Sequence, residues 1–173
     1  EADPQARLIW ATVGGVRVGS AYVPNGAAVG SDKYAYKRRW LARLADRVED
    51  ELARHERLVL GGDFNVARDA RDVSDEAEWE GTVLYNPEVR ADLEALLDRG
   101  LADLFRLRET AGGRFTWWDY RQNSFLRDRG LRIDYLLASP AQAARLESVE
   151  IDAGERAGKK PSDHAPVTAT FAP

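Results

Sequence analysis

The sequence predicts a mixed α/β fold, because short apolar runs with strand character alternate with longer stretches of helical periodicity. The chain has 173 residues, within the range of one domain and long enough to bury a sizeable core. It contains no internal repeat, low-complexity tract or linker-like segment. We therefore expect residues 1–173 to form a single domain.

The first two strands are predicted as a hairpin. Residues 7–13 and 16–23 are rich in β-branched and apolar side chains, and Gly14-Gly15 between them is a strong two-residue turn signal. A loop with Pro24, Asn25 and Gly26 follows the second strand.

Two long helices follow. Ser31-Asp32 is predicted to cap the first, while Asn86-Pro87 opens the second and Gly100 ends it. Residues 66–85, in front of the second helix, form a charged loop longer than ordinary connections, which indicates a functional or mobile segment. The apolar stripes are Trp40, Leu41, Leu44, Val48 and Leu52 in the first helix and Leu93, Leu96 and Leu97 in the second.

The C-terminal half is predicted to be mainly strands. Their expected positions are residues 115–118, 131–137, 148–151 and 165–171, with a short helix opening at Ser139-Pro140.

Composition restricts the chemistry. With 25 Lys and Arg against 29 Asp and Glu the net charge is −4, so a surface for nucleic acid must be a local patch. The absence of cysteine excludes disulfides and thiolate zinc sites but leaves oxygen-ligated Mg²⁺ or Mn²⁺ open. With no secretory signal or membrane-spanning run in the sequence, a cytoplasmic location is the default expectation.

The most informative segment is Gly61-Gly62-Asp63-Phe64-Asn65, which follows the apolar run of residues 58–60. In extended geometry Asp63 and Asn65 would point the same way, while Phe64 turns into the core. A carboxylate and a carboxamide at one strand end are suited to a hard cation or a phosphate.

Two later strands carry similar residues. Asp134 lies within an apolar strand and needs a partner, because a buried carboxylate is unfavourable unless it is paired or binds a cation. Asp163 and His164 precede the last strand, where the imidazole is either held by a carboxylate and aimed at an anion or simply caps a loop. The other histidine, His55, lies among charged residues and is interpreted as a solvated surface residue.

Taken together, these motifs resemble the exodeoxyribonuclease III family of abasic-site (AP) endonucleases, within the endonuclease/exonuclease/phosphatase superfamily. The resemblance extends from about residue 7 to residue 172. It implies part of a four-layer α/β/β/α sandwich with two packed mixed sheets. The segments that carry it are Gly62-Asp63-Phe64-Asn65, Arg132-Ile133-Asp134-Tyr135-Leu136-Leu137-Ala138-Ser139, Ser162-Asp163-His164-Ala165-Pro166-Val167, residues 21–26 and residues 114–139.

The resemblance implies Mg²⁺-assisted hydrolysis, with Mn²⁺ as an alternative metal, of the DNA phosphodiester 5′ to an abasic site, with 3′-to-5′ exonuclease and 3′-phosphodiesterase capacity. Asp63 would act on the attacking water or at the leaving group. The remaining implied roles are Asn65 holding Asp63 and the phosphate, His164 and Tyr22 contacting the phosphate, Asp134 supporting His164, Asp163 binding the metal, and Asp63, Asn65 and His164 forming a second metal position.

The segment from Trp117 to Gly130 interleaves aromatic rings with arginines, a pattern suited to stacking on bases or sugars and contacting phosphates. A packed loop with surface arginines is the plainer alternative. By resemblance, Trp117, Leu131 and Ile133 would line a pocket for a flipped-out abasic sugar, with Arg121 near the backbone. The expected partner is duplex DNA with abasic sites or blocked 3′ ends, bound by a monomer without any membrane.

The resemblance also predicts that the N-terminal third of the family domain, with a Glu that binds the metal, has no counterpart here. The strand at residues 7–13 would then leave apolar surface and an unpaired edge exposed. Two alternatives to a nuclease stay open: a non-catalytic DNA-binding remnant, and a phosphodiesterase of the same fold acting on lipid or inositol phosphates. The aromatic and arginine-rich segment disfavours the second.

Overall fold

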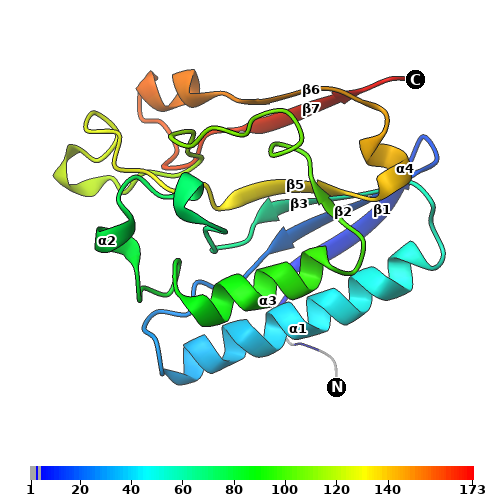
Figure 1. Ribbon diagram of the computed structural model, residues 1–173, viewed down its shortest axis with the longest axis horizontal. Coiled ribbons are helices and arrows are strands. Elements are labelled where there is room, and N and C mark those ends of the chain that lie inside the picture. The colour runs from blue at the N-terminus through cyan, green and yellow to red at the C-terminus, as the bar shows by residue number, and fades with distance from the viewer. Residues whose placement is uncertain (1–2, 4) are drawn as a thin grey trace.

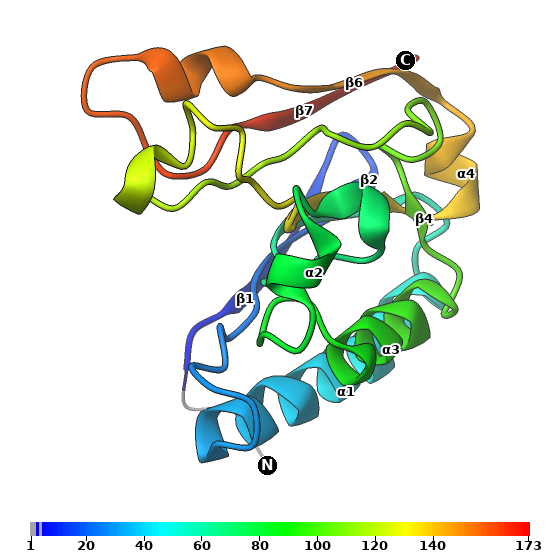
Figure 2. The same ribbon diagram turned by 60° about the vertical axis from the view of Figure 1, so that its left-hand side comes forward.

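The computed structural model describes residue 3 and residues 5–173 as two sheets with two long helices against the larger one (Figures 1 and 2). The large sheet has the order β1-β2-β3-β5-β4 and is mixed, since β2 and β3 run parallel and the other pairs antiparallel. Its strands are β1 (Leu8–Val13), β2 (Val16–Tyr22), β3 (Leu58–Asp63), β4 (Ala102–Asp103) and β5 (Asp134–Ala138).

The small sheet pairs β6 (Leu146–Ile151) with β7 (Val167–Phe171) in antiparallel fashion. It packs on the large sheet through one cluster, in which Val59 and Leu136 lie with Val149 and Ala169. The predicted α/β class with two packed sheets is confirmed.

Helices α1 (Asp32–Leu52) and α3 (Pro87–Leu97) cover the other face of the large sheet. Both predicted starts are confirmed: the Ser31 hydroxyl accepts the Tyr34 N–H, and the Asn86 side chain accepts the N–H groups of the first turn of α3. Shorter helical pieces are η1 (Ala70–Asp72), α2 (Glu76–Trp79), η2 (Arg121–Asn123), α4 (Pro140–Ala143) and η3 (Ala153–Ala157).

The main core lies between these helices and the sheet. Leu41 and Val48 of α1, Leu60 of β3 and Leu93 of α3 are all completely buried there. Burying such side chains stabilises the fold by roughly 1.5–3 kcal/mol each. Because β3 and β5 have apolar neighbours on both faces, their ends are held in fixed positions.

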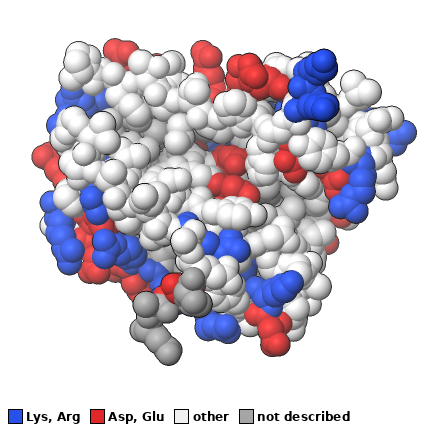
Figure 3. Space-filling model, turned by 180° about the vertical axis from the view of Figure 1, so that it is seen from behind, with Lys and Arg blue, Asp and Glu red and all other residues white. Residues whose placement is uncertain are grey.

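The β1–β2 hairpin turns at Gly14 and Gly15, whose φ values of 56° and 78° are the left-handed pair that a two-residue turn requires. As predicted, β1 lies at a sheet edge, and apolar side chains on it are open: Ile9 is 70% exposed and Val13 65%. Seen from behind, the molecule presents a broad surface with few charged side chains and a group of acidic ones at its centre (Figure 3).

Two predicted strands need correction, and one strand was missed. Residues 115–118 form no strand, because only Trp117 makes isolated bridges, to Leu131 on one side and His164 on the other. The strand expected at residues 131–137 begins only at Asp134. The strand β4 was not predicted, since two residues are too few to show a periodicity.

In the part of the chain that the structure describes, no helix combines the length and apolar character needed to cross a membrane.

Candidate functional site

Three site residues predicted from the sequence lie side by side across the large sheet. Tyr22 of β2 is in register with Asp63 of β3, and Asp63 is in register with Asp134 of β5. Residues paired in this way point to the same face of a sheet. That face is opposite to the one that α1 and α3 cover, because Leu60, three residues before Asp63, belongs to the helix-side core.

Directly after β3 the chain makes a tight turn that joins the two polar residues. The Asn65 backbone N–H donates to Asp63 Oδ1 at 2.8 Å, and its side-chain amide donates to Asp63 Oδ2 at 2.9 Å. The expected extended geometry is wrong here, because Asn65 has φ 52°. Asparagine tolerates this left-handed conformation, and an Asx-type turn favours it. Phe64 is fully buried, as predicted.

The Asn65 side chain is held from two further sides. Its Oδ1 accepts from Asn25 Nδ2 at 3.0 Å, and its Nδ2 also donates to the Val23 carbonyl at 3.0 Å. The amide oxygen is therefore already engaged by protein. Asn25 was not assigned to the site from the sequence, although its place in the loop that follows β2 was the available signal.

Gly62 allows β2 and β3 to approach each other at this point. Its φ is 145°, and a Cβ atom on it would lie 1.9 Å from the Ala21 carbonyl oxygen. A side chain at position 62 is therefore sterically impossible without moving a strand. The glycine places Asp63 where it can lie beside Asp134.

The second polar pair comes from β5 and the loop before β7. His164 Nδ1 lies 2.9 Å from Asp134 Oδ2, while Nε2 has no hydrogen-bond partner among the described residues. Burial alone would lower the pKa of His164, but the hydrogen bond and charge of Asp134 outweigh it and raise that pKa. The imidazole is thus held by a carboxylate and biased toward its protonated form.

A buried threonine fixes the backbone that carries Asp134. Thr116 Oγ1 accepts the N–H groups of Ile133 at 3.0 Å and of Asp134 at 3.1 Å. This bond pattern connects the aromatic loop to β5 just where the strand begins. Thr116 was also missed from the sequence, because a single threonine in an apolar run carries no distinctive signal.

Trp117 lies at the junction of three segments. It bridges Leu131 and His164 through its backbone, and its indole N–H donates to Asp163 Oδ2 at 3.0 Å. Its ring packs edge-to-face on Trp79 of α2, with centroids 6.1 Å apart. The charged loop predicted at residues 66–85 therefore delivers an aromatic ring beside the site.

The other two residues expected to line a sugar pocket are buried, whereas Arg121, expected near the DNA backbone, is exposed. Leu131 is fully buried and Ile133 is 2% exposed, so both lie packed in a cluster with Val73 and Tyr85 and offer almost no accessible surface. The Arg121 side chain is 86% exposed and pairs with Asp119.

Burial, reinforced by the charge of Asp134, raises the pKa of Asp63 to about 6. Asp134 has His164 as its ion-pair partner, whereas no ion pair is found for Asp63 among the described residues, so the Asp63 carboxylate is the one suited to a hard cation. However, no group of three or more His, Cys, Asp or Glu within the described ranges could hold a metal ion by itself. The residues present therefore fit only a cation that takes most of its ligands from water or phosphate.

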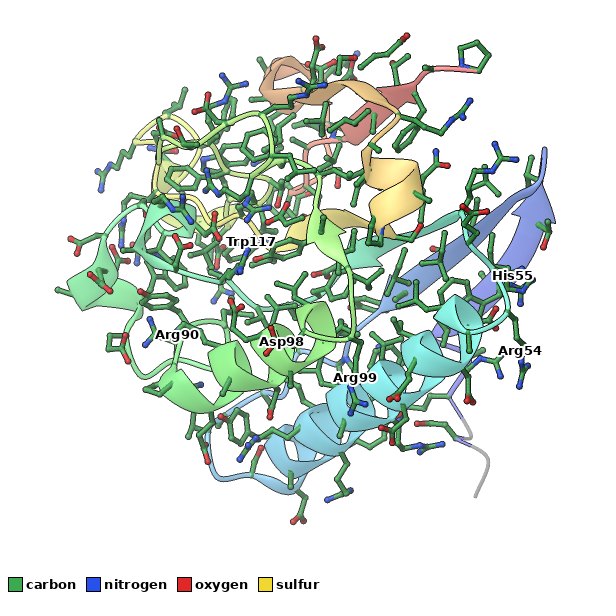
Figure 4. The ribbon with its side chains drawn as sticks, turned by 45° about the vertical axis from the view of Figure 1, so that its right-hand side comes forward. Arg54, His55, Arg90, Asp98, Arg99 and Trp117 are labelled. Atoms are coloured by element: carbon green, nitrogen blue, oxygen red, sulfur yellow. The ribbon has the colours of Figure 1, made fainter. Side chains whose placement is uncertain are left out.

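His55 plays no part in this arrangement. It lies beyond the C-terminal end of α1, is partly exposed and lies 3.4 Å from a Glu51 carboxylate oxygen. Figure 4 places it well away from Trp117.

Two packed sheets, with an acid–amide pair and an acid–imidazole pair at adjoining strand ends, define the class of α/β phosphoesterases. The chain belongs to the Endonuclease/Exonuclease/phosphatase family, whose profile matches residues 3–164. It is 36% identical to exodeoxyribonuclease III of Haemophilus influenzae, over 98% of this chain and 68% of that protein. The curated relatives that match are nucleases, and the chain is an enzyme of this nuclease type.

Solved structures agree. The 3′ phosphatase NExo from Neisseria, bound to a product DNA hairpin, matches with a TM-score of 0.96 and 47% identity over 98% of this chain and 66% of that one. An AP endonuclease from Archaeoglobus fulgidus matches with a TM-score of 0.93 and 33% identity over 99% and 68%. The chain thus spans about two thirds of the length of these relatives.

Proposed function

We propose that this site hydrolyses DNA phosphodiesters on the 5′ side of abasic sites and processes 3′ ends by the same chemistry. The observation that carries the proposal is the side-by-side placement of Asp63, held by Asn65, and Asp134, held by His164. A proton acceptor and a cationic donor then face the same surface of the sheet. The first can take the proton of an attacking water, and the second can stabilise the charge that develops on the phosphoryl oxygens.

Asp63 is the proposed proton acceptor for the attacking water or proton carrier at the leaving group. Its pKa of about 6 supports this role, because a general base works best with a pKa near the operating pH. Asn65 keeps the carboxylate oriented through two hydrogen bonds. We assign to Asn65 the orientation of Asp63. Both hydrogens of its side-chain amide already donate, to Asp63 Oδ2 and to the Val23 carbonyl, so the contact with the phosphate expected from the sequence would require one of these bonds to be exchanged.

His164 is the proposed donor to a phosphoryl oxygen, through the Nε2 that no described residue engages. Asp134 fixes the ring and favours its protonated form. Tyr22, which is 54% exposed beside Asp63, can offer its phenol to the same phosphate. Fixed donors of this kind stabilise charge that develops in the transition state.

A divalent cation, Mg²⁺ or Mn²⁺, would add charge neutralisation at the phosphoryl oxygens. Asp63 is the proposed protein ligand on this face, and Asp163 a second. The Asp163 oxygen that accepts the Trp117 indole N–H is already occupied, and so is the Asn65 amide oxygen. Of the metal ligands expected from the sequence, Asp63 is thus the one that the geometry supports best.

The aromatic loop is the proposed DNA contact. Arg121 extends into solvent, and Trp117 and Trp79 form a paired aromatic wall beside His164. Because the net charge of the chain is negative, such a local patch must supply the attraction to phosphate. Opening a pocket at Leu131 and Ile133 would require the loop to move on binding.

The higher identity to NExo, which is named as a 3′ phosphatase and as a 3′-5′ exonuclease, favours a second candidate, an enzyme that processes 3′ ends alone. The identity is 47–48% to the two NExo structures and 33% to the AP endonuclease. An abasic nucleotide is the least costly to flip out of a duplex, so loss of this activity would indicate a closed sugar pocket. The buried Leu131 and Ile133 are consistent with that outcome.

The test uses three labelled duplexes: one with an internal tetrahydrofuran abasic analogue, one with a 3′-phosphate end, and one intact. Each is incubated with the chain and Mg²⁺, Mn²⁺ or EDTA. We expect metal-dependent cleavage of the first two that Asp63→Asn lowers by at least about 100-fold, whereas Arg54→Ala, far from the site, leaves it unchanged. Cleavage of the 3′-phosphate alone selects the second candidate. If Asp63→Asn cleaves as well as the parent chain, the assignment of the site is wrong.

A further inference from the structure

One lysine outside the proposed catalytic set has an unusual position. Lys37 lies on α1 and is completely buried. Its Nζ donates to three backbone carbonyl oxygens, those of Asn25 at 3.2 Å, Asn65 at 2.6 Å and Val83 at 2.5 Å. Among residues 3 and 5–173 no carboxylate lies within ion-pair distance of it.

Such a group is costly to bury. A cation without a carboxylate partner loses its hydration and regains only hydrogen bonds to neutral acceptors. Burial accordingly lowers the pKa of Lys37 to about 7, although the charges of Asp63 and Asp92 act in the opposite direction. An apolar side chain would avoid the cost of burying a charge, but it would leave the three carbonyl oxygens without this donor.

The three carbonyls belong to three separate loops that meet beneath the site. Asn25 follows β2, Asn65 follows β3, and Val83 lies between α2 and α3. Lys37 also supports the first loop directly, since a Cβ on Gly26 would lie 3.1 Å from Lys37 Cδ. One ammonium group therefore ties the loops to the rigid helix α1.

Two of these loops meet again through their side chains. Asn25 Nδ2 donates to Asn65 Oδ1, and Asn65 Nδ2 donates to Asp63 Oδ2. Lys37 thus holds the backbones of both residues whose side chains form the chain of hydrogen bonds that ends on Asp63. It also bonds the carbonyl of Asn65, the residue in the left-handed conformation.

We infer that Lys37 is a positioning residue: its ammonium group fixes the turn at Asn65 and the Asn25–Asn65 amide pair, and so orients the Asp63 carboxylate. The inference rests on the proposed function only in treating Asp63 as the reacting group. The positioning itself is measurable without DNA, so the two can fail separately.

The chain contains no cysteine, which permits a matched chemical test. Lys37→Cys is alkylated in denaturant with 2-bromoethylamine, which rebuilds a lysine-like ammonium, or with 1-bromopropane, which gives a neutral side chain of the same length. Both products are refolded, and the parent chain is taken through the same steps. The two products differ only in the terminal charge and its hydrogen bonds.

The readouts are hydrogen exchange of the Asn65 backbone amide and the intraresidue amide-to-Hα NOE that reports its left-handed φ. We expect the aminoethyl product to match the parent chain. The propyl product should lose at least about tenfold in Asn65 exchange protection and show a weaker NOE, because three carbonyls lose a charged donor. Amides in the middle of β3 serve as the internal reference.

Leu41→Ala is the control for general destabilisation, since Leu41 is fully buried on the same helix in the main core. It should lower the free energy of unfolding and leave the Asn65 NOE unchanged. If the propyl product keeps the parent's protection and NOE at Asn65, the ammonium group is unnecessary and the inference is overturned. Equal loss in the aminoethyl and propyl products also overturns it, provided that the parent chain refolds.

Discussion

Two buried cations lie near the ends of β3 and β5, and they are compensated in opposite ways. Arg132 is 1% exposed and lies between two buried carboxylates, Asp72 and Asp103. Lys37, on α1, has only neutral carbonyl partners. The carboxylate that could have paired with Lys37, Asp63, instead faces the site with a raised pKa.

In the Arg132 network each buried charge has a partner of opposite sign. Its guanidinium reaches Asp72 at 2.7 and 3.0 Å and Asp103 at 3.1 and 2.7 Å, and Arg106 adds a second cation on Asp72. It also stacks on the Tyr135 ring, 4.4 Å from the centroid. In the Arg132 region buried charges of opposite sign pair with each other, whereas near the candidate site the Lys37 cation and the Asp63 carboxylate have no ion-pair partner among the described residues.

The largest effect should come from breaking the compensated network. Arg132→Met leaves Asp72 and Asp103 buried without their main partner, so we expect the free energy of unfolding to fall by about 3–5 kcal/mol. Urea denaturation followed by circular dichroism measures it. Arg121→Met, at a side chain that is 86% exposed, is the matched control and should change it by less than about 0.5 kcal/mol. If Arg132→Met lowers the free energy of unfolding by less than about 1 kcal/mol, the paired charges around Arg132 do not hold the structure as we expect.

A second change tests the link between the aromatic loop and β5. Thr116→Val keeps the shape of the side chain but removes the acceptor for two backbone N–H groups, at Ile133 and Asp134. We expect a loss of about 2–4 kcal/mol of unfolding free energy. Thr116→Ser keeps the acceptor and should lose less. Equal losses would mean that packing of the methyl group, and not the hydroxyl, holds the strand.

The third prediction concerns the uncompensated carboxylate. Because the folded-state pKa of Asp63 is raised from 3.8 to about 6, the folded chain binds the extra proton between these values, and stability falls as the pH rises through them. Asp63→Asn removes this penalty. Relative to the parent chain it should gain about 1–3 kcal/mol between pH 4 and pH 7.5, measured by urea denaturation in EDTA. A pH-independent difference would show that Asp63 is not buried in this way.

The smallest effect is expected at the imidazole. Asp134 raises the pKa of His164, so the stability that the protonated ring contributes is present below its unfolded value of 6.5 and is lost as the pH rises through the folded value. Asp134→Asn should lower that pKa and reduce stability at pH 5.5 by less than about 1 kcal/mol. NMR titration of the imidazole protons measures it, with His55 as the internal reference. An unchanged His164 titration would contradict the pairing.

Much of the fold followed from local signals. The turn at Gly14-Gly15 and the caps at Ser31 and Asn86 satisfy backbone requirements within a few residues, so the sequence alone was sufficient to place them. The prediction of a strand at residues 115–118 was wrong for the opposite reason. Its conformation depends on Leu131 and His164, which are distant in sequence and bridge Trp117 singly.

The candidate site also has parts that the sequence predicts and parts that it does not. Asp63 and Asn65 were visible as a pair, yet their geometry depends on the left-handed turn that extended periodicity could not predict. The burial of Lys37 could not be predicted from the sequence, because Lys37 lies in a charged helical segment where most lysines would be exposed to solvent. Its role depends on three carbonyls, and carbonyls carry no sequence signal.

Gly62 has a consequence for recognising relatives of this chain. Gly62 and Asp63, the last two residues of β3, are required for different reasons. Gly62 is required by the close approach of the β2 and β3 backbones, and Asp63 by the proposed reaction. A protein that had abandoned the reaction would be free to replace Asp63, but it would have to keep Gly62 for as long as β2 and β3 stay paired. In a related sequence, a glycine at this position therefore indicates the fold, and the aspartate that follows it indicates that the reaction is retained.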